Sequence, residues 1–94
     1  MTEFRVMCDH VKVDKKGRSW IEQARRPIGR TGQTLTTVFK DKAEAEKCLE
    51  KWEQSGKAYE ENRIEMAQRF PDLYTTIIHQ TNYRVQSREV TDWE

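Results

Sequence analysis

Apolar side chains are scarce in this chain, so any core must be built from the few places where they gather. Leu, Ile, Val and Phe supply 17 of its 94 residues, a fraction close to that of disordered proteins. However, the formal net charge is only +1 and nine residues are aromatic, which weakens self-repulsion and gives large burial per side chain. We therefore expect residues 1–94 to form a single small domain with a thin core.

The pattern of the first third of the chain is typical of a β-hairpin. Residues 4–13 are rich in β-branched and aromatic side chains that alternate with polar ones. Asp14 can open a turn that Gly17 closes with a positive φ, so that a second strand returns over residues 19–26. Residues 34–39 have the β-branched content of a third strand.

Two helical stretches are expected after these strands. Asp41 can cap the first helix, whose apolar residues recur at helical spacing as far as Trp52. Gly56 interrupts this pattern, and it either ends the helix or only bends it. A second helix is expected from about residue 58 to residue 70, where Pro71 stops it.

Residues 74–90 alternate again between apolar and polar side chains. They fit either one long strand or a hairpin that turns at Asn82, and we favour the single strand. The expected order is therefore βββααβ. This order describes an α+β domain in which an antiparallel sheet of about four strands carries two helices on one face.

The sequence favours a cytoplasmic protein without a membrane partner. No stretch is apolar for long enough to cross a bilayer, and residues 1–5 lack the basic and then apolar pattern of a signal peptide. Cys8 and Cys48 do not have the spacing of a disulfide framework. Free thiols in a reducing compartment are therefore expected.

Enzymatic motifs are sparse. Neither a phosphate-binding P-loop nor a Gly-x-Ser-x-Gly nucleophile elbow is present. Four residues are potential metal ligands, but no Cys-x-x-Cys or His-x-x-x-His pair anchors a site among Cys8, His10, Cys48 and His79. We predict no enzymatic activity, no cofactor and no metal. A small enzyme with a Cys–His or metal site is the least favoured hypothesis.

Charge separates along the chain. Residues 1–42 carry ten Lys or Arg and five acidic residues, whereas residues 43–94 carry seven and eleven. Such a separation favours a polyanionic partner for the basic part. The alternative is that the two oppositely charged parts attract each other within the fold.

The basic cluster is the strongest functional signal. Its side chains are expected on a hairpin tip, a strand and a glycine-containing loop, where they can reach phosphates: Lys12, Lys15, Lys16, Arg18, Arg25, Arg26 and Arg30. Gln23 and Arg25 are also side chains that can bond base edges. Trp20 or Tyr83 could stack on bases if they lie outside the core. The alternative is ordinary solubilising charge.

Two runs of residues carry a family resemblance. Residues 16–21 read Lys-Gly-Arg-Ser-Trp-Ile, and residues 37–45 read Thr-Val-Phe-Lys-Asp-Lys-Ala-Glu-Ala. Together they resemble the AP2-like DNA-binding domains of phage and transposon integrases, over about residues 4–54. In that family three strands lie in the DNA major groove and a helix backs them. The resemblance implies that the DNA-contacting residues are Arg18, Gln23, Arg25, Arg26, Thr34 and Thr36.

We therefore expect a non-enzymatic binding protein that docks on a nucleic acid or a nucleoprotein complex. Its small size, lack of catalytic motifs and separated charge are similar to those of the anti-CRISPR proteins of phages. We predict an inhibitor of host defence encoded by a phage or mobile element. It would act in the host cytoplasm on a partner such as a CRISPR effector. The alternative is an AP2-like DNA-binding or regulatory domain that uses its three-stranded sheet.

Overall fold

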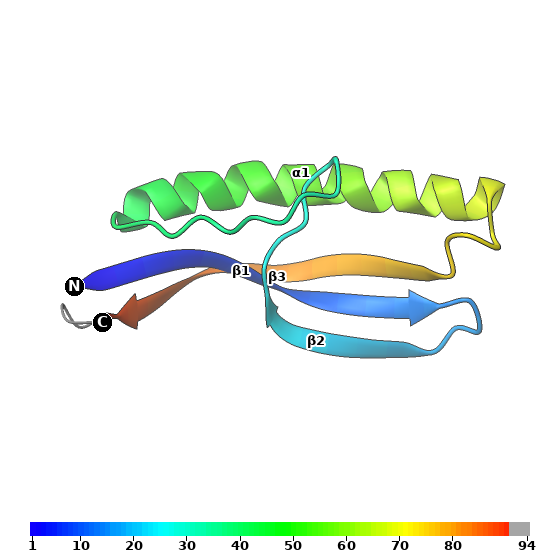
Figure 1. Ribbon diagram of the computed structural model, residues 1–94, viewed down its shortest axis with the longest axis horizontal. Coiled ribbons are helices and arrows are strands. Elements are labelled where there is room, and N and C mark those ends of the chain that lie inside the picture. The colour runs from blue at the N-terminus through cyan, green and yellow to red at the C-terminus, as the bar shows by residue number, and fades with distance from the viewer. Residues whose placement is uncertain (91–94) are drawn as a thin grey trace.

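The computed structural model describes residues 1–90, which form one antiparallel sheet and one long helix (Figure 1). The strands are β1 (Thr2–Asp14), β2 (Ser19–Arg25) and β3 (Thr76–Glu89), and the helix α1 (Lys42–Arg69) precedes β3. β1 is the central strand, because the sheet has the order β2-β1-β3. The α+β class with an antiparallel sheet is confirmed. The expected four strands and two helices are wrong.

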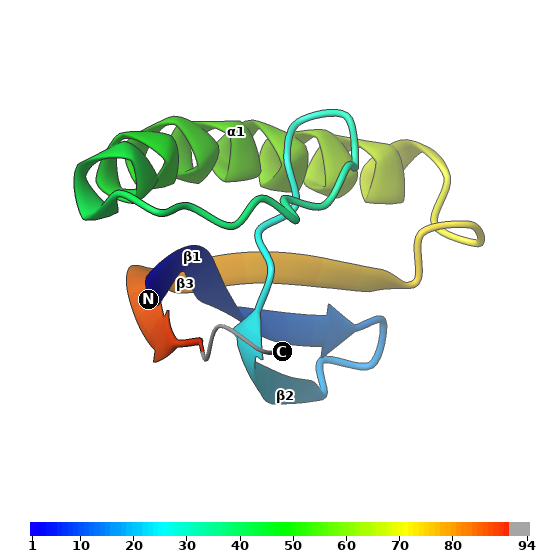
Figure 2. The same cartoon turned by 60° about the vertical axis from the view of Figure 1, so that its left-hand side comes forward.

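The helix covers only part of the sheet. α1 packs against β3 and β1 but not against β2, which lies farthest from the helix (Figure 1 and Figure 2). The fully buried core side chains include Val6 and Cys8 of β1 and Ala45 of α1. On β2, by contrast, Trp20 and Ile21 remain 44% and 64% exposed.

The two expected helices are one because Gly56 does not break the helix. It is buried where α1 passes over β3, and a Cβ there would collide with the hydroxyl of Tyr83 and lie 3.1 Å from Nε2 of Gln80. Glycine thus permits the close approach of α1 to β3, at a helix-propensity cost of about 1 kcal/mol relative to alanine. At the start of α1, Asp41 caps as predicted, because its Oδ1 accepts a hydrogen bond from Ala43 N at 2.9 Å.

The expected third strand over residues 34–39 is not part of the sheet. Thr34 bridges to Ile28 within its own loop, and Phe39 forms an isolated bridge with Phe4. The two backbone hydrogen bonds of the second bridge measure 2.7 and 2.8 Å. β2 already occupies this edge of β1 along its C-terminal half. The segment therefore finds only a short stretch of β1 to pair with.

Both outer strands are bulged at the same level of β1. The register of β1 with each neighbour shifts beside Asp9. Each bulge contains a residue other than glycine with a positive φ, Ala24 at 54° and Asn82 at 53°. The left-handed conformation is common for asparagine but costly for alanine, so the surroundings must hold it in place.

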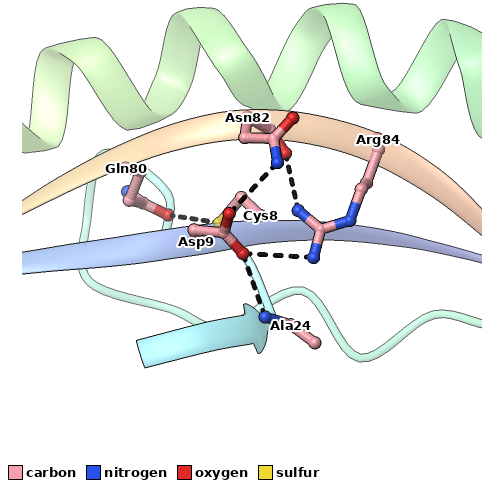
Figure 3. Close-up of polar contacts among 6 residues, drawn as sticks. All are labelled: Cys8, Asp9, Ala24, Gln80, Asn82 and Arg84. Atoms are coloured by element: carbon pink, nitrogen blue, oxygen red, sulfur yellow. Dashed lines mark hydrogen bonds and ion pairs between the residues drawn. The ribbon is translucent and has the colours of Figure 1, made fainter. Parts of the chain in front are cut away.

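Asp9 supplies the acceptors that hold both bulges (Figure 3). Its Oδ1 accepts from the backbone N of Ala24 and from Nη2 of Arg84, and its Oδ2 accepts from Nδ2 of Asn82, all at 3.1 Å. These bonds keep the pKa of Asp9 below its ordinary value, and the Asn82 amide contributes most. The carboxylate of Asp9 on the central strand therefore fixes the position of the bulge in both β2 and β3. The bulge in turn determines the direction of β2.

The last strand is a single continuous strand, as the sequence predicts. β3 is a single strand, as favoured for residues 74–90, although it is the third strand rather than the fourth. Asn82 was the alternative position for a turn. It does depart from strand geometry, but the departure is a bulge within one continuous strand.

Candidate nucleic-acid interface

The turn between β1 and β2 is a fixed platform for basic side chains. Oδ1 of Asp14 accepts hydrogen bonds from the backbone N–H groups of Lys16 and Arg18, both at 2.9 Å. The Asp14 carbonyl accepts from Gly17 N at 3.0 Å, and Gly17 adopts a φ of 81°. The turn predicted from Asp14 and Gly17 is confirmed. The side chains on it project from a backbone that is already ordered.

This turn and the loop that follows α1 lie at the same end of the molecule (Figure 1). A surface cavity of about 330 Å³ opens between them. Its lining combines cations, hydroxyls and an indole, with Asp14 as the one carboxylate of the described lining. We call the remaining lining residues the hairpin end: Lys15, Lys16, Arg18, Trp20, Thr75 and Thr76.

The cations of the hairpin end are only loosely neutralised. Nε of Arg18 donates to Oδ2 of Asp14 at 2.7 Å, but the Arg18 side chain is 73% exposed. Nζ of Lys15 lies 3.5 Å from Oδ1 of Asp72, and both side chains are exposed. Exposed pairs of this kind contribute little and exchange readily with other anions. Within residues 1–90, Lys16 has no acidic partner at ion-pair distance.

Other basic residues predicted for the site are engaged elsewhere. Lys12 and Arg25 both pair with Glu22, at 2.9 and 3.0 Å. Arg26 is half-buried, and its Nη1 donates to the Thr37 carbonyl at 3.3 Å. The acidic residue between the two cations thus lowers the charge that β2 offers to a polyanion.

The rest of the predicted set is exposed and lies away from the hairpin end. Gln23 lies in the bulge of β2, and Arg30 lies on the loop that crosses toward α1. Thr34 and Thr36 belong to the segment that does not join the sheet. The structure therefore gathers Lys15, Lys16 and Arg18 around one cavity. Arg25, Arg26 and Thr34 line a different cavity of about 280 Å³, which Glu22 also lines.

The aromatic candidates separate clearly. Trp20 is 44% exposed and lines the cavity, so its ring is accessible for stacking. Tyr83 is half-buried beneath Gly56 of α1, and burial raises the pKa of its hydroxyl. Thr75 and Thr76 were not recognised as site residues, because the alternating pattern of residues 74–90 places them simply at the start of a strand.

The cysteines and histidines do not form a common site. Cys8 is buried, and burial raises the pKa of its thiol to about 12, so it lacks the thiolate character of a nucleophile. Its Sγ donates to Oε1 of Gln80 at 3.6 Å. His10 contacts a backbone carbonyl, whereas His79 pairs with Glu60 of α1. Across the described part of the chain, no three His, Cys, Asp or Glu side chains are grouped as metal ligands.

No family model, curated protein or solved structure matches this chain. Within residues 1–90, no helix has both the length and the apolar character that crossing a bilayer requires.

Proposed function

We propose that this chain is a non-enzymatic binding protein whose hairpin end docks on a nucleic acid, free or held in a nucleoprotein complex. The observation that carries the proposal is the placement of Lys16, Arg18 and the exposed Trp20 around one cavity. Cations supply phosphate contacts, and an exposed indole offers a face on which any base can stack. The biological role we propose is inhibition of host defence by a protein of a phage or mobile element, with a nucleoprotein such as a CRISPR effector as partner.

The fixed turn supports this proposal energetically. Because Asp14 already orders the backbone of Lys16 and Arg18, binding immobilises only their side chains. Thr75 and Thr76 add hydroxyls on the opposite wall, where they can donate to phosphate oxygens. A site of this kind tracks a backbone and stacks bases without strong sequence preference, which suits a single strand.

The salt dependence of binding tests the proposal. Three phosphate contacts on a single strand predict a slope of log K against log salt of about −2, measurable by fluorescence anisotropy with a labelled oligonucleotide. Lys16→Ala should reduce the size of this slope by about 0.7. Lys57→Ala is the matched control, because Lys57 is exposed on α1 outside the cavity.

Equal affinity of the two variants would contradict a role for the hairpin end. If free strands do not bind, the same pair of variants is tested for capture of a purified CRISPR effector ribonucleoprotein. The proposal then requires that Lys16→Ala loses the complex and that Lys57→Ala retains it. Absence of both kinds of binding overturns the proposed function.

The second candidate function is that of an AP2-like DNA-binding domain, and the exposure of β2 favours it. Every residue of β2 except Glu22 is exposed. In this alternative Gln23 and Arg25 read base edges of a duplex while α1 backs the sheet. A variant with Gln23→Ala and Arg25→Ala should then lose duplex affinity, and Lys16→Ala should matter less. The hairpin-end proposal predicts the opposite order.

A further inference from the structure

A second cavity lies on a different part of the surface, where the loop between β2 and α1 crosses the helix. It has a volume of about 170 Å³. The polar and aromatic side chains that matter for its chemistry come from the loop, from α1 and from the segment before β3: Arg30, Tyr59, Asn62, Arg63 and Tyr74. None of these residues lines the cavity of the hairpin end.

Arg63 is held in place by two aromatic rings. The centre of its guanidinium lies 5.2 Å from the ring centroid of Tyr59 and 5.0 Å from that of Tyr74. Within residues 1–90 it forms no ion pair with a carboxylate. Stacking restricts a side chain that otherwise has many rotamers, and it leaves the edge of the guanidinium available to a ligand.

Arg30 is positioned by the anchoring of its loop. Its backbone N donates to Oγ of Ser55 at 2.8 Å. The preceding Gly29 packs so closely on α1 that a Cβ would lie 2.7 Å from the Trp52 ring. The backbone of Arg30 is therefore fixed beside the cavity that Arg63 also lines.

The lining selects an oxyanion of limited size. Two guanidiniums and the Asn62 amide offer donors, and among the described residues that line this cavity there is no carboxylate. Glu61 and Glu65 line the adjoining hollow, which also contains Arg30. Their charge disfavours a second anionic group on that side, so a single terminal anion fits better than the interior of a polyanion.

We propose that this cavity binds a terminal phosphate group, with Arg63 and Arg30 as its two guanidinium donors. The planar fork of arginine matches phosphate oxygens in pairs, and such charge-assisted bonds are the strong ones. The group can come from free phosphate or from the phosphorylated end of a nucleic-acid strand. This phosphate site does not depend on the proposed function, because its lining shares no residue with the hairpin end.

The test is a titration followed by NMR of the arginine side-chain Nε–Hε signals. Inorganic phosphate is added at constant ionic strength against chloride, and saturable shifts of the Arg63 and Arg30 signals are expected at about 1 mM. Arg63→Lys keeps the charge but loses the planar fork, so it should weaken phosphate binding about tenfold. Lys57→Gln is the control on the same helix and should leave binding unchanged.

A second variant covers the case in which Arg63→Lys disturbs packing on Tyr59. Arg30 is exposed, so Arg30→Gln should weaken phosphate binding several-fold while the circular dichroism spectrum and Tm stay at wild-type values. Shifts that do not saturate, or binding that both variants retain, would overturn the proposal. Lys16→Ala should leave phosphate binding at Arg63 and Arg30 intact. This result distinguishes failure of this proposal from failure of the proposed function of the hairpin end.

Two dinucleotides distinguish the sources of the phosphate group. A 5′-phosphorylated dinucleotide that shifts the Arg63 and Arg30 signals at lower concentration than inorganic phosphate assigns the site to a strand end. Equal binding of the two assigns it to the free anion. If the same dinucleotide without its 5′-phosphate shifts the Arg63 and Arg30 signals equally well, the terminal phosphate is not what the cavity recognises and the proposal fails.

Discussion

Two Arg–Asp ion pairs serve different purposes in this molecule. Asp9 pairs with Arg84 within the sheet, and Asp14 pairs with Arg18 in the turn between β1 and β2. Asp9 and Arg84 have side chains 13% and 35% exposed, and the carboxylate also receives bonds from two other residues. Asp14 is similarly enclosed at 15%, but its partner Arg18 is 73% exposed. In the first pair both charges serve the fold. In the second the carboxylate shapes a turn and the guanidinium is left for solvent or a partner.

The same contrast extends to the regions around the two pairs. Beneath α1, apolar side chains such as Val6 and Cys8 are fully buried. On β2, which α1 does not cover, Trp20 and Ile21 are substantially exposed. Substitutions in the covered region should therefore change stability, and those around the hairpin end should change binding.

The largest effect is expected at Asp9. Asp9→Ala removes the acceptor for Ala24 N, Asn82 and Arg84 together, and it leaves a left-handed alanine without support. Urea unfolding at pH 7 should show a greater loss of stability than for any other substitution proposed here. As a control, Asn82→Gly removes one donor but suits the positive φ, so it should cost much less.

Acidification should reproduce part of this loss. The pKa of Asp9 in the folded protein lies below its ordinary value of 3.8, so its stabilising contribution is present above that value. The contribution is lost as the pH falls through the folded pKa. The difference in unfolding free energy between wild type and Asp9→Ala should therefore narrow below about pH 4. A difference that is constant from pH 7 to pH 3 would show that the charge of Asp9 is unimportant.

The next effect in size concerns the contact between α1 and β3. Gly56→Ala should destabilise the fold by about 2 kcal/mol, because its Cβ overlaps the Tyr83 hydroxyl. Tyr83→Phe removes that hydroxyl, so in this background the same alanine should cost far less. Urea unfolding of the four proteins in this double-mutant cycle measures the coupling. Independent effects of the two substitutions would contradict the close approach.

The turn, the helix cap and Gly56 differ in how far they can be predicted from the sequence. The turn at Asp14 and Gly17 and the cap at Asp41 were predicted because their determinants lie within four residues. The sequence leaves open whether Gly56 ends or bends the helix, because the role of this glycine depends on Tyr83, which lies on another element. No local pattern distinguishes a glycine that ends a helix from one that allows a close contact.

The same limit applies to the candidate site. The sequence predicts that Lys15, Lys16 and Arg18 lie close together, because one turn carries them, and they do line one cavity. It could not show that Glu22 would engage both Lys12 and Arg25. The first pair depends on the register of β1 with β2, and the second joins two residues of β2 on either side of its bulge. Segment 34–39 has strand-forming residues, but β2 already occupies this edge of β1 along its C-terminal half.

A smaller effect, on binding alone, is expected at Trp20. Trp20→Ala should weaken single-strand binding about tenfold, the usual contribution of one stacked base. Its neighbour Ile21 is more exposed, at 64%, and does not line the cavity, so Ile21→Ala is the matched control. Anisotropy titrations at one salt concentration compare the two variants. Similar affinities would mean that exposure of an apolar side chain, rather than its place at the cavity, governs binding.

The smallest effect is expected for Arg25→Ala, although Arg25 belongs to the predicted basic cluster. Its guanidinium lies 3.0 Å from Oε2 of Glu22. Removing it deletes one cation but also frees a carboxylate that still has Lys12 as partner, so single-strand affinity should fall less than about twofold. Titration at low salt maximises the contribution of the Arg25 charge to affinity, because screening is then weakest. A tenfold loss there would extend the binding surface along β2 and would favour recognition by the sheet over recognition by the hairpin end.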